Sequence, residues 1–516
     1  MLILNNASHW QSRNFGHQTV YSPDPGLFNL IENAPSLQDK KFWANLYTSF
    51  ACIITSSNND EIIMVRDHFG LEPFYYSLVN NQLIFGSNLP NILEQLKQKN
   101  LSIKKNEQQV ASFFLNFGTY NNDYTDETYY KNVYRVEPGY LLKLNQFSSN
   151  YNLKKICFWQ LDKSATTIQY KTDEEYLEHF ESLLNEAVCA QIFPNQLVAA
   201  EYSGGLDSTT VLTAAYQNNI HPELFMHTPN AGEDEPREVI SGKAVIQQFN
   251  LKANYIDATE FDTIETLQNC AKYFAGAAPY IFFMYAGNIH QAVAKNKHTT
   301  LLSGFGGDEC VSSHAGLRFC IASLYKNQQY KLAWQELYQH YHMRGTTPPH
   351  LLKRVVQLFK MSHPLLFDKL AGARDIGSTL LSYLKQTSFN KPTSGMMMPK
   401  HRSLRDLEYW SIHGKEVRMR VEYSAVLGKK LGFRYQYPML YPKLVDFCYR
   451  LPLEQKRRNG VNRYLVRKYL AKSLGHDLYD KHPKVGSGSI MPATIDKAKA
   501  LQQQGLFKEA RTGVQF

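Results

Sequence analysis

The sequence predicts an α/β fold in two domains, in which a layered sheet domain precedes a doubly wound parallel sheet with a helical extension. At 516 residues the chain is longer than one ordinary domain. Up to about residue 160 it consists of short β-rich runs broken by turn residues. Beyond that point apolar strands alternate with helices, which is typical of a parallel sheet.

The first region contains β-forming runs at 50–56, 61–67, 74–79, 82–87 and 136–144. A capping pattern then opens a helical segment within 166–191. Because the pattern changes from strands to a helix here, we place the domain boundary near residue 165. The predicted domains are therefore 1–165 and 166–516.

The second region begins with a predicted buried strand at 197–203, a helix at 209–217 and a second strand at 222–228. A further apolar strand precedes residue 303. From about 320 to 480 the sequence is mainly helical. This order predicts a parallel sheet that carries a helical extension.

The composition argues against several classes of protein. The formal charge of +10 is spread along the chain, and we interpret Lys456, Arg457 and Arg458 as a solvated helix face rather than a nucleic-acid surface. The seven cysteines include no CxxC pair, which indicates buried or idle thiols. No apolar run is typical of a signal peptide or a membrane helix. We expect a cytoplasmic protein that binds neither nucleic acid nor a membrane.

The segment SGGLDST at 203–209 falls where a buried strand should end and a helix begin. Ser203, Gly204 and Gly205 can turn the backbone so that its N–H groups converge on an anion at the helix start. No Gly-Lys-Ser/Thr closes the segment, so it differs from the Walker pattern. It resembles the loop of the ATP pyrophosphatases, and the alternative is a plain small-residue turn.

A second glycine-rich segment, SGFGGDE at 303–309, also follows an apolar strand. Asp207 and Asp308 are then the natural pair to hold Mg²⁺ against phosphates, because hard cations prefer carboxylate oxygens. The alternative for Asp308 and Glu309 is an acid pair that complements a helix dipole. Together the two segments predict ATP and Mg²⁺ as cofactors.

Several separate segments carry a family resemblance. RDHFGLEPFYY at 66–76, IFGSN at 84–88 and 130–144 resemble the glutaminase-type domain of the asparagine synthetase superfamily, and the two glycine-rich segments and 418–488 resemble its synthetase domain. The resemblance implies a degenerate Ntn-hydrolase-like domain followed by an ATP pyrophosphatase domain. The expected cofactor-binding residues are Tyr202, Ser203, Gly204, Gly205, Asp207, Ser208, Met226, Ser303 and Gly304.

The resemblance also implies a lost activity. The family's glutaminases use a cysteine just after the initiator methionine, where this chain has Leu2. Leucine cannot attack an amide, so we expect no glutamine hydrolysis. In this respect the chain is similar to lasso-peptide cyclases and β-lactam synthetases, which join an activated carboxylate to an amine already present in the substrate.

The same relatives imply candidate catalytic residues. Lys484 corresponds to the family's catalytic lysine, and Glu422 corresponds to a glutamate that supports amine deprotonation. The alternatives are a solvated lysine and a helix-surface glutamate paired with Arg418. Phe305 stands where relatives carry glutamate or tyrosine, so a base must come from Glu422 or from the substrate.

Three further positions concern the C-terminal part of the chain. Tyr441 replaces an aspartate of the asparagine synthetases. Arg463 and Arg467 stand where family members often carry lysine and arginine, so the resemblance implies that either can face pyrophosphate. The alternative is that they only cap or solvate a helix.

The sequence therefore predicts an ATP-dependent amide ligase, and we expect a macrolactam or lasso-peptide-type cyclase. The expected partners are a small-molecule or peptide substrate with a carboxylate and an amine, and a precursor peptide with its processing protease. The alternatives are an asparagine synthetase that uses ammonia and a catalytically silent scaffold.

Overall fold

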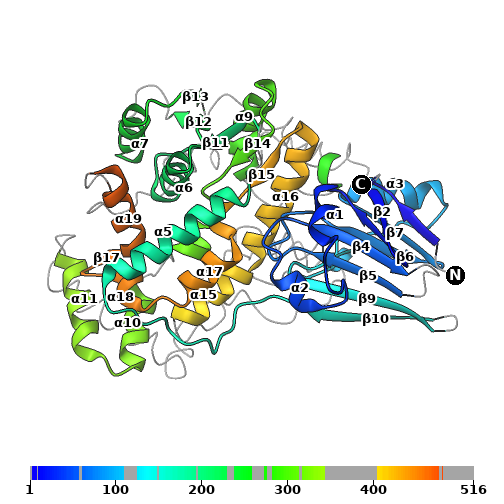
Figure 1. Cartoon of the computed structure of the whole chain (residues 1–516), viewed down its shortest axis with the longest axis horizontal. Helices are drawn as coiled ribbons and strands as arrows, with labels where there is room; N and C mark the ends of the chain where they lie inside the picture. The colour runs from blue at the N-terminus through cyan, green and yellow to red at the C-terminus, as the bar shows by residue number, and fades with distance from the viewer. Residues whose placement is uncertain are drawn as a thin grey trace, which may run out of the picture.

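The computed structural model describes residues 3–8, 10–56, 61–109, 125–147, 150–192, 196–228, 237–257, 272–275, 282–312, 317–342, 404–475 and 479. Figure 1 shows two parts: a strand-rich N-terminal part, in blue, and a larger part in which helices surround a second sheet. The long helix α16 (Lys415–Leu431) lies between the two.

The N-terminal part contains two sheets. One has the strand order β1-β7-β6-β8, and the other has the order β10-β9-β5-β4-β3-β2. The strands are β1 (Ile3–Asn6), β2 (Gln11–Phe15), β3 (Gln18–Ser22), β4 (Ala51–Ser56), β5 (Glu61–Arg66), β6 (Tyr75–Val79), β7 (Gln82–Gly86), β8 (Tyr134–Arg135), β9 (Tyr140–Phe147) and β10 (Asn150–Cys157).

The alternation of side chains along the strands explains the layers. In β4, Ile53 contributes to the core between the sheets, whereas Cys52 and Ile54 point to an outer core beneath helices α1 (Gly26–Ile31) and α2 (Lys40–Ala44). Helix α3 (Leu89–Gln98) covers the opposite sheet. The predicted layered α/β sandwich is confirmed.

The second part is built on a parallel sheet with the strand order β13-β12-β11-β14-β15. These strands are β11 (Val198–Glu201), β12 (Glu223–Thr228), β13 (Ala253–Asp257), β14 (Thr300–Leu302) and β15 (Arg434–Gln436). The chain moves outward from β11 in one direction and later returns to its other side with β14. The strand order therefore reverses between β11 and β14, which is the usual position of a ligand crevice in such sheets.

Helices pack on this sheet and extend beyond it. Helix α5 begins with the predicted cap, in which Thr172 and Glu175 bond each other's backbone N–H groups. The helical elements are α5 (Asp173–Cys189), α6 (Leu206–Gln217), α7 (Arg237–Gln248), α9 (Phe282–Lys295), a π-helical turn (Gly307–Val311), α10 (Leu317–Lys326), α11 (Tyr330–His342), α15 (Leu404–His413), a 3-10 turn (Pro438–Leu440), α17 (Pro442–Tyr449), α18 (Leu453–Lys456) and α19 (Tyr464–Leu474). A small ribbon pairs β16 (Arg457–Arg458) with β17 (Val461–Asn462).

The two parts share apolar contacts. Phe69 belongs to the main core of the second part, and Tyr47, Leu71 and Trp159 pack against that core. The predicted boundary near residue 165 lies between the end of β10 and the start of α5. It stays a prediction.

The interpretation of the basic cluster as a solvated helix face is wrong for two of its residues. Lys456 and Arg457 are buried, and they pair with the buried carboxylates of Glu408 and Glu336. Arg458 is partly exposed and pairs with Asp173. The sequence pattern could not reveal this because the acidic partners lie far away along the chain.

The six described cysteines are free, and four of them are buried: Cys52, Cys310, Cys320 and Cys448. Burial raises the pKa of the Cys320 thiol to about 12, so this thiol stays protonated at neutral pH. Within the described ranges, no helix combines the length and the apolar character that a membrane span requires.

Candidate functional site

The two glycine-rich loops lie side by side because they follow neighbouring strands. Strands β11 and β14 pair in parallel, and each is followed at its carboxyl end by one loop. A Cβ atom added to Gly304 would lie 2.6 Å from the backbone nitrogen of Ser208, and one added to Gly307 would lie 2.3 Å from Cγ of Asp207. Only glycine permits so close an approach of the two loops.

The first loop is arranged as an anion site. Gly204 has a φ of +74°, and Gly205 caps the N-terminus of α6. The Ser203 and Ser208 hydroxyl oxygens lie 3.1 Å apart, and the backbone N–H of Gly205 donates to Ser203 Oγ at 3.2 Å. Ser203 is exposed. Exposed hydroxyls beside a helix N-terminus can bind phosphate oxygens, because the helix dipole favours negative charge there.

Asp207 and Asp308 meet at one guanidinium group. Arg463 donates from Nη1 to Asp207 Oδ2 at 3.1 Å, and its Nη2 pairs with Asp308 Oδ1. The hydroxyl of Ser312 donates to Asp207 Oδ1 at 3.4 Å. Arg463 is buried and has a left-handed backbone with a φ of +59°. The fold therefore brings together the two acids that the sequence singled out.

This pair of carboxylates fits a hard divalent cation in its chemistry. Carboxylate oxygens are the ligands that Mg²⁺ prefers, and Mg²⁺ is commonly held by one or two of them together with substrate phosphates. In the described part of the chain, no group of three or more His, Cys, Asp or Glu side chains is arranged to hold a metal. Two acids beside the N-terminus of α6 suit a cation that arrives together with an anionic substrate.

Tyr479 contacts the first loop from the C-terminal side, and no sequence pattern indicated this contact. Its hydroxyl donates to the carbonyl oxygen of Gly204 at 2.8 Å and lies 3.0 Å from Thr209 Oγ1. The guanidinium of Arg467 donates to the carbonyl oxygen of Tyr479, so Arg467 supports this contact. Lys484 and Leu2 lie outside the described residues.

Three of the expected cofactor-binding side chains are buried. Tyr202 is buried, and its hydroxyl lies 3.3 Å from Thr209 Oγ1. Met226 is fully buried in β12. Ser303, at the end of β14, is also buried and donates to Glu201 at 3.5 Å. Contact of these residues with a nucleotide stays a prediction.

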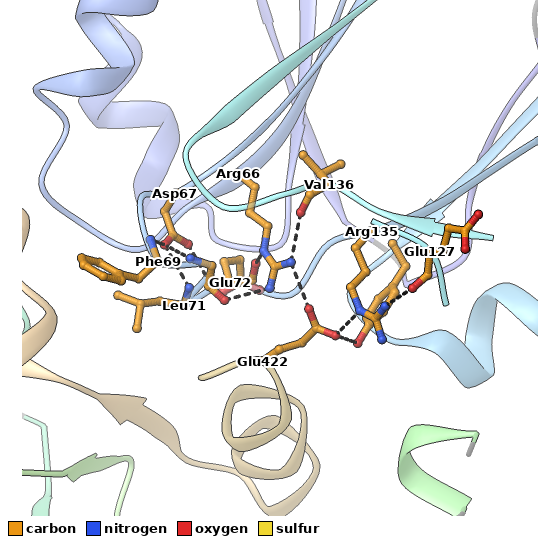
Figure 2. Close-up of polar contacts among 11 residues, drawn as sticks. Arg66, Asp67, Phe69, Leu71, Glu72, Glu127, Arg135, Val136 and Glu422 are labelled. Atoms are coloured by element: carbon orange, nitrogen blue, oxygen red, sulfur yellow. Dashed lines mark hydrogen bonds and ion pairs between the residues drawn. The ribbon is translucent and has the colours of Figure 1, made fainter. Parts of the chain in front are cut away.

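Glu422 is not a helix-surface glutamate, because it is only 1% exposed. Figure 2 shows its carboxylate turned from α16 toward the N-terminal domain. It accepts from Arg135 Nε and the Tyr75 hydroxyl at 2.7 Å each, and from Arg66 Nη1 at 3.1 Å. Burial alone would raise the pKa of this carboxyl, but Arg135 and Arg66 outweigh burial and lower the pKa to about 2. A carboxylate so engaged is a weak proton acceptor.

A second cluster lies behind the loops. Arg420, on α16, donates to Glu201 at 3.4 Å, and its guanidinium carbon lies 5.6 Å from the centroid of the Phe305 ring. Phe305 also contacts the Tyr437 ring edge to face, with the centroids 5.9 Å apart. Sequence reasoning missed Glu201 and Arg420. A charged residue inside an apolar strand was the available signal for Glu201.

Tyr441 has a structural partner. Its ring is buried, and its hydroxyl donates to Glu186 of α5 at 2.7 Å. The position that carries an aspartate in asparagine synthetases therefore joins two helices here.

The fold and the site define a class: an α/β domain with two glycine loops at the switch point of its parallel sheet, joined to a layered sandwich. The family model for asparagine synthase matches residues 179–509, and the glutamine amidotransferase domain model matches residues 35–155. The chain belongs to the asparagine synthase family.

Individual relatives are distant. A putative glutamine-hydrolysing asparagine synthetase 2 of Methanocaldococcus jannaschii is 28% identical over 48% of this chain and 46% of its own length. Asparagine synthetase 2 of Bacillus subtilis is 22% identical, and amidase chry2 of Gibberella zeae is 25% identical, each over 33% of this chain and 23% of the relative. The chain thus spans less than half the length of these relatives.

Among solved structures, the glutamine phosphoribosylpyrophosphate amidotransferase of B. subtilis, complexed with ADP and GMP, is 9% identical. The match covers 48% of this chain and 72% of that chain with a TM-score of 0.16. So low a score supports no conclusion beyond those drawn above.

Proposed function

We propose that this chain is an ATP- and Mg²⁺-dependent ligase that forms an amide bond through an adenylated carboxylate. The observation that carries the proposal is the meeting of the two glycine loops, which brings Asp207 and Asp308 together beside the N-terminus of α6. The names of the asparagine synthetase relatives agree with this reaction class.

In the first step, an oxygen of the substrate carboxylate attacks the α-phosphorus of ATP, and the bond to pyrophosphate breaks. In the second step, an amine attacks the acyl carbon, loses a proton, and releases AMP. Ser203, Ser208 and the backbone of the first loop would bind the phosphates. Asp207 and Asp308 would hold Mg²⁺, which neutralises phosphate charge when bound.

Lys484 remains the proposed cation for the acyl-transfer step. Tyr479 precedes it by five residues and contacts Gly204. A fixed cation near the phosphates stabilises the charge that develops in both steps.

The amine, we propose, belongs to the same substrate, as in macrolactam and lasso-peptide-type cyclases. Leu2 supports this because it cannot serve as the glutaminase nucleophile. A precursor peptide and its processing protease are the corresponding partners. A second candidate is an asparagine synthetase that uses free ammonia. Two relatives are named glutamine-hydrolysing asparagine synthetases, which supports asparagine synthesis but not ammonia as the nitrogen source. The Phe305 side chain counts against this candidate, because it can neither accept a proton nor hydrogen-bond an amine.

The first test is ATP–pyrophosphate exchange with the full-length chain, Mg²⁺ and a panel of acids that includes aspartate and peptides with a free amine. We expect exchange with one class of acid and its loss in Asp207→Ala. The matched control is Asp446→Asn, because Asp446 is a partly exposed acid paired with Arg450 on α17. If no acid supports ATP–pyrophosphate exchange and calorimetry detects no ATP binding, the result would favour a catalytically silent scaffold.

Product analysis separates the two candidates. Mass spectrometry of the reaction with a peptide should show the loss of one water, as expected for ring closure. Asparagine formed from aspartate and ammonia would support the second candidate instead. Glutamate released from glutamine would contradict the lost glutaminase activity.

A further inference from the structure

We infer that Glu422 is a positioning residue, through which the N-terminal domain holds α16 and, by means of Arg420, the glycine loops of the synthetase site. This inference rests on the proposed function only for its catalytic consequence. Its structural part concerns contacts between described residues, and it can be tested without turnover.

On the N-terminal side, two arginines that bind Glu422 are also held by hydrogen bonds within their own domain. Arg66 is buried and donates to three carbonyl oxygens, those of Glu72, Val136 and Gly70, besides its bond to Glu422 (Figure 2). Arg135 donates to the carbonyl oxygen of Glu127 as well as to Glu422. Each guanidinium is therefore fixed by its own domain before it meets the carboxylate. The ion pairs between Glu422 and these arginines therefore have a defined geometry. Loss of one partner leaves the charge of the other buried without compensation.

The turn that carries Arg66 is equally fixed. Asp67 accepts the backbone N–H groups of Phe69, Gly70 and Leu71 on one oxygen and that of Glu72 on the other. In this chain the RDHFG segment, which resembles part of a glutaminase domain, thus forms a rigid support for α16.

Helix α16 connects the contact at Glu422 with the glycine loops. Residues two positions apart on an α-helix point in nearly opposite directions, about 200° apart. Glu422 faces the N-terminal domain, whereas Arg420 contacts Glu201 at the end of β11 and the Phe305 ring in the second loop. A rotation or shift of α16 would therefore move the supports of both loops.

A second attachment restricts α16 further along. Lys429 pairs with Glu72 of the N-terminal domain, and Arg434, just beyond the helix, contacts Glu72 and Asp24. With attachments at two places, α16 resists both rotation and tilting. The N-terminal domain thereby has a role that requires no glutaminase chemistry.

The test compares Glu422→Gln and Arg135→Gln with Arg13→Gln, a control that breaks the exposed pair between Arg13 and Glu32 on the same domain. Hydrogen exchange is followed at bonded amides of the second loop and of the π-helical turn that follows it: Ser303, Gly307, Cys310 and Ser312. We expect exchange at these amides to rise about tenfold in both test variants and to stay unchanged in the control. A role limited to domain docking would raise exchange only in α16 and the N-terminal strands, and that result would overturn the inference.

The catalytic consequence has its own signature. If Glu422 positions α16, Arg135→Gln should lower kcat about as much as Glu422→Gln, roughly tenfold, and the double variant should be no worse than either. The pH dependence of kcat should keep its shape in all of them. If Glu422 is instead the base, Glu422→Gln alone should abolish the acidic limb of that profile. If the two variants raise hydrogen exchange in the second loop but the wild-type chain has no ligase activity, the proposed function is refuted and the positioning role stands.

Discussion

At the scale of single residues, the site depends on positions where a side chain is missing. Gly307 lets the second loop lie against Asp207, and Gly304 lets it lie against Ser208. The acids and hydroxyls predicted to bind Mg²⁺ and ATP are aligned by these close backbone approaches. The glycines of SGFGGDE are therefore required for the geometry of the site, just as its charged residues are.

Substitution of Gly307 by alanine should destabilise the chain by about 1–3 kcal/mol, because the new Cβ would overlap the Asp207 carboxyl group. It should also abolish ATP binding in calorimetry. The control is Gly287→Ala in α9, where nothing lies within 4 Å of the new atom. That change should stabilise the helix by about 0.5–1 kcal/mol. Equal effects of the two substitutions in denaturant titrations would contradict this account of the loops.

Arg463 supplies positive charge between Asp207 and Asp308. Substitution Arg463→Gln should therefore lower the free energy of unfolding by about 1–3 kcal/mol when no divalent cation is present. Mg²⁺ should restore part of this loss, because a cation bound by the same acids replaces the missing charge. Thermal denaturation with and without Mg²⁺ measures the difference. We expect Mg²⁺ to raise Tm more in this variant than in the wild type or in Arg450→Gln. An identical rise in all three would count against the carboxylates as the cation site.

At the scale of the secondary-structure elements, α16 joins the two domains. Its buried Glu422 is charged because two guanidinium groups compensate for the lost hydration. Its neighbour Arg420 reaches the loops that follow β11 and β14. A single helix therefore connects the strand-rich sandwich to the edge of the parallel sheet that carries the two glycine loops.

This arrangement predicts a specific acid sensitivity. The pKa of Glu422 falls from 4.5 to about 2 on folding, so the folded state favours the ionised form. The resulting stability, about 3 kcal/mol, is fully present above pH 4.5 and is lost as the pH falls toward 2. In denaturant titrations the stability difference between wild type and Glu422→Gln should therefore be largest above pH 5 and shrink as the pH falls. A difference that is independent of pH would show that Glu422 does not gain this stability from its charge.

At the scale of the whole molecule, the domains are joined by apolar as well as ionic contacts. Phe69 lies in the core of the synthetase part, and Trp159 packs against it. Arg66 and Glu422, which are 356 positions apart in sequence, meet in the same interface. Such an interface couples the unfolding of the two domains.

Calorimetry of the full chain should accordingly show one unfolding transition. A chain that begins at residue 166 should have a lower Tm or aggregate, because it exposes the apolar surface that Phe69 and Trp159 cover. The variant Arg13→Gln, which leaves the interface intact, should still unfold in one step. Two separate transitions in the full chain, with the truncated chain reproducing one of them, would contradict the coupling.

The sequence alone determined several strands of each sheet, the cap of α5, the two glycine loops and their acids, because alternation, capping and turn chemistry act over a few residues. Only the tertiary structure decided the partners: Arg463 between Asp207 and Asp308, Glu422 against Arg66 and Arg135, and Arg420 beside Phe305. These contacts join residues that are more than a hundred positions apart. No local pattern encodes them, since they depend on how sheets, helices and domains pack together.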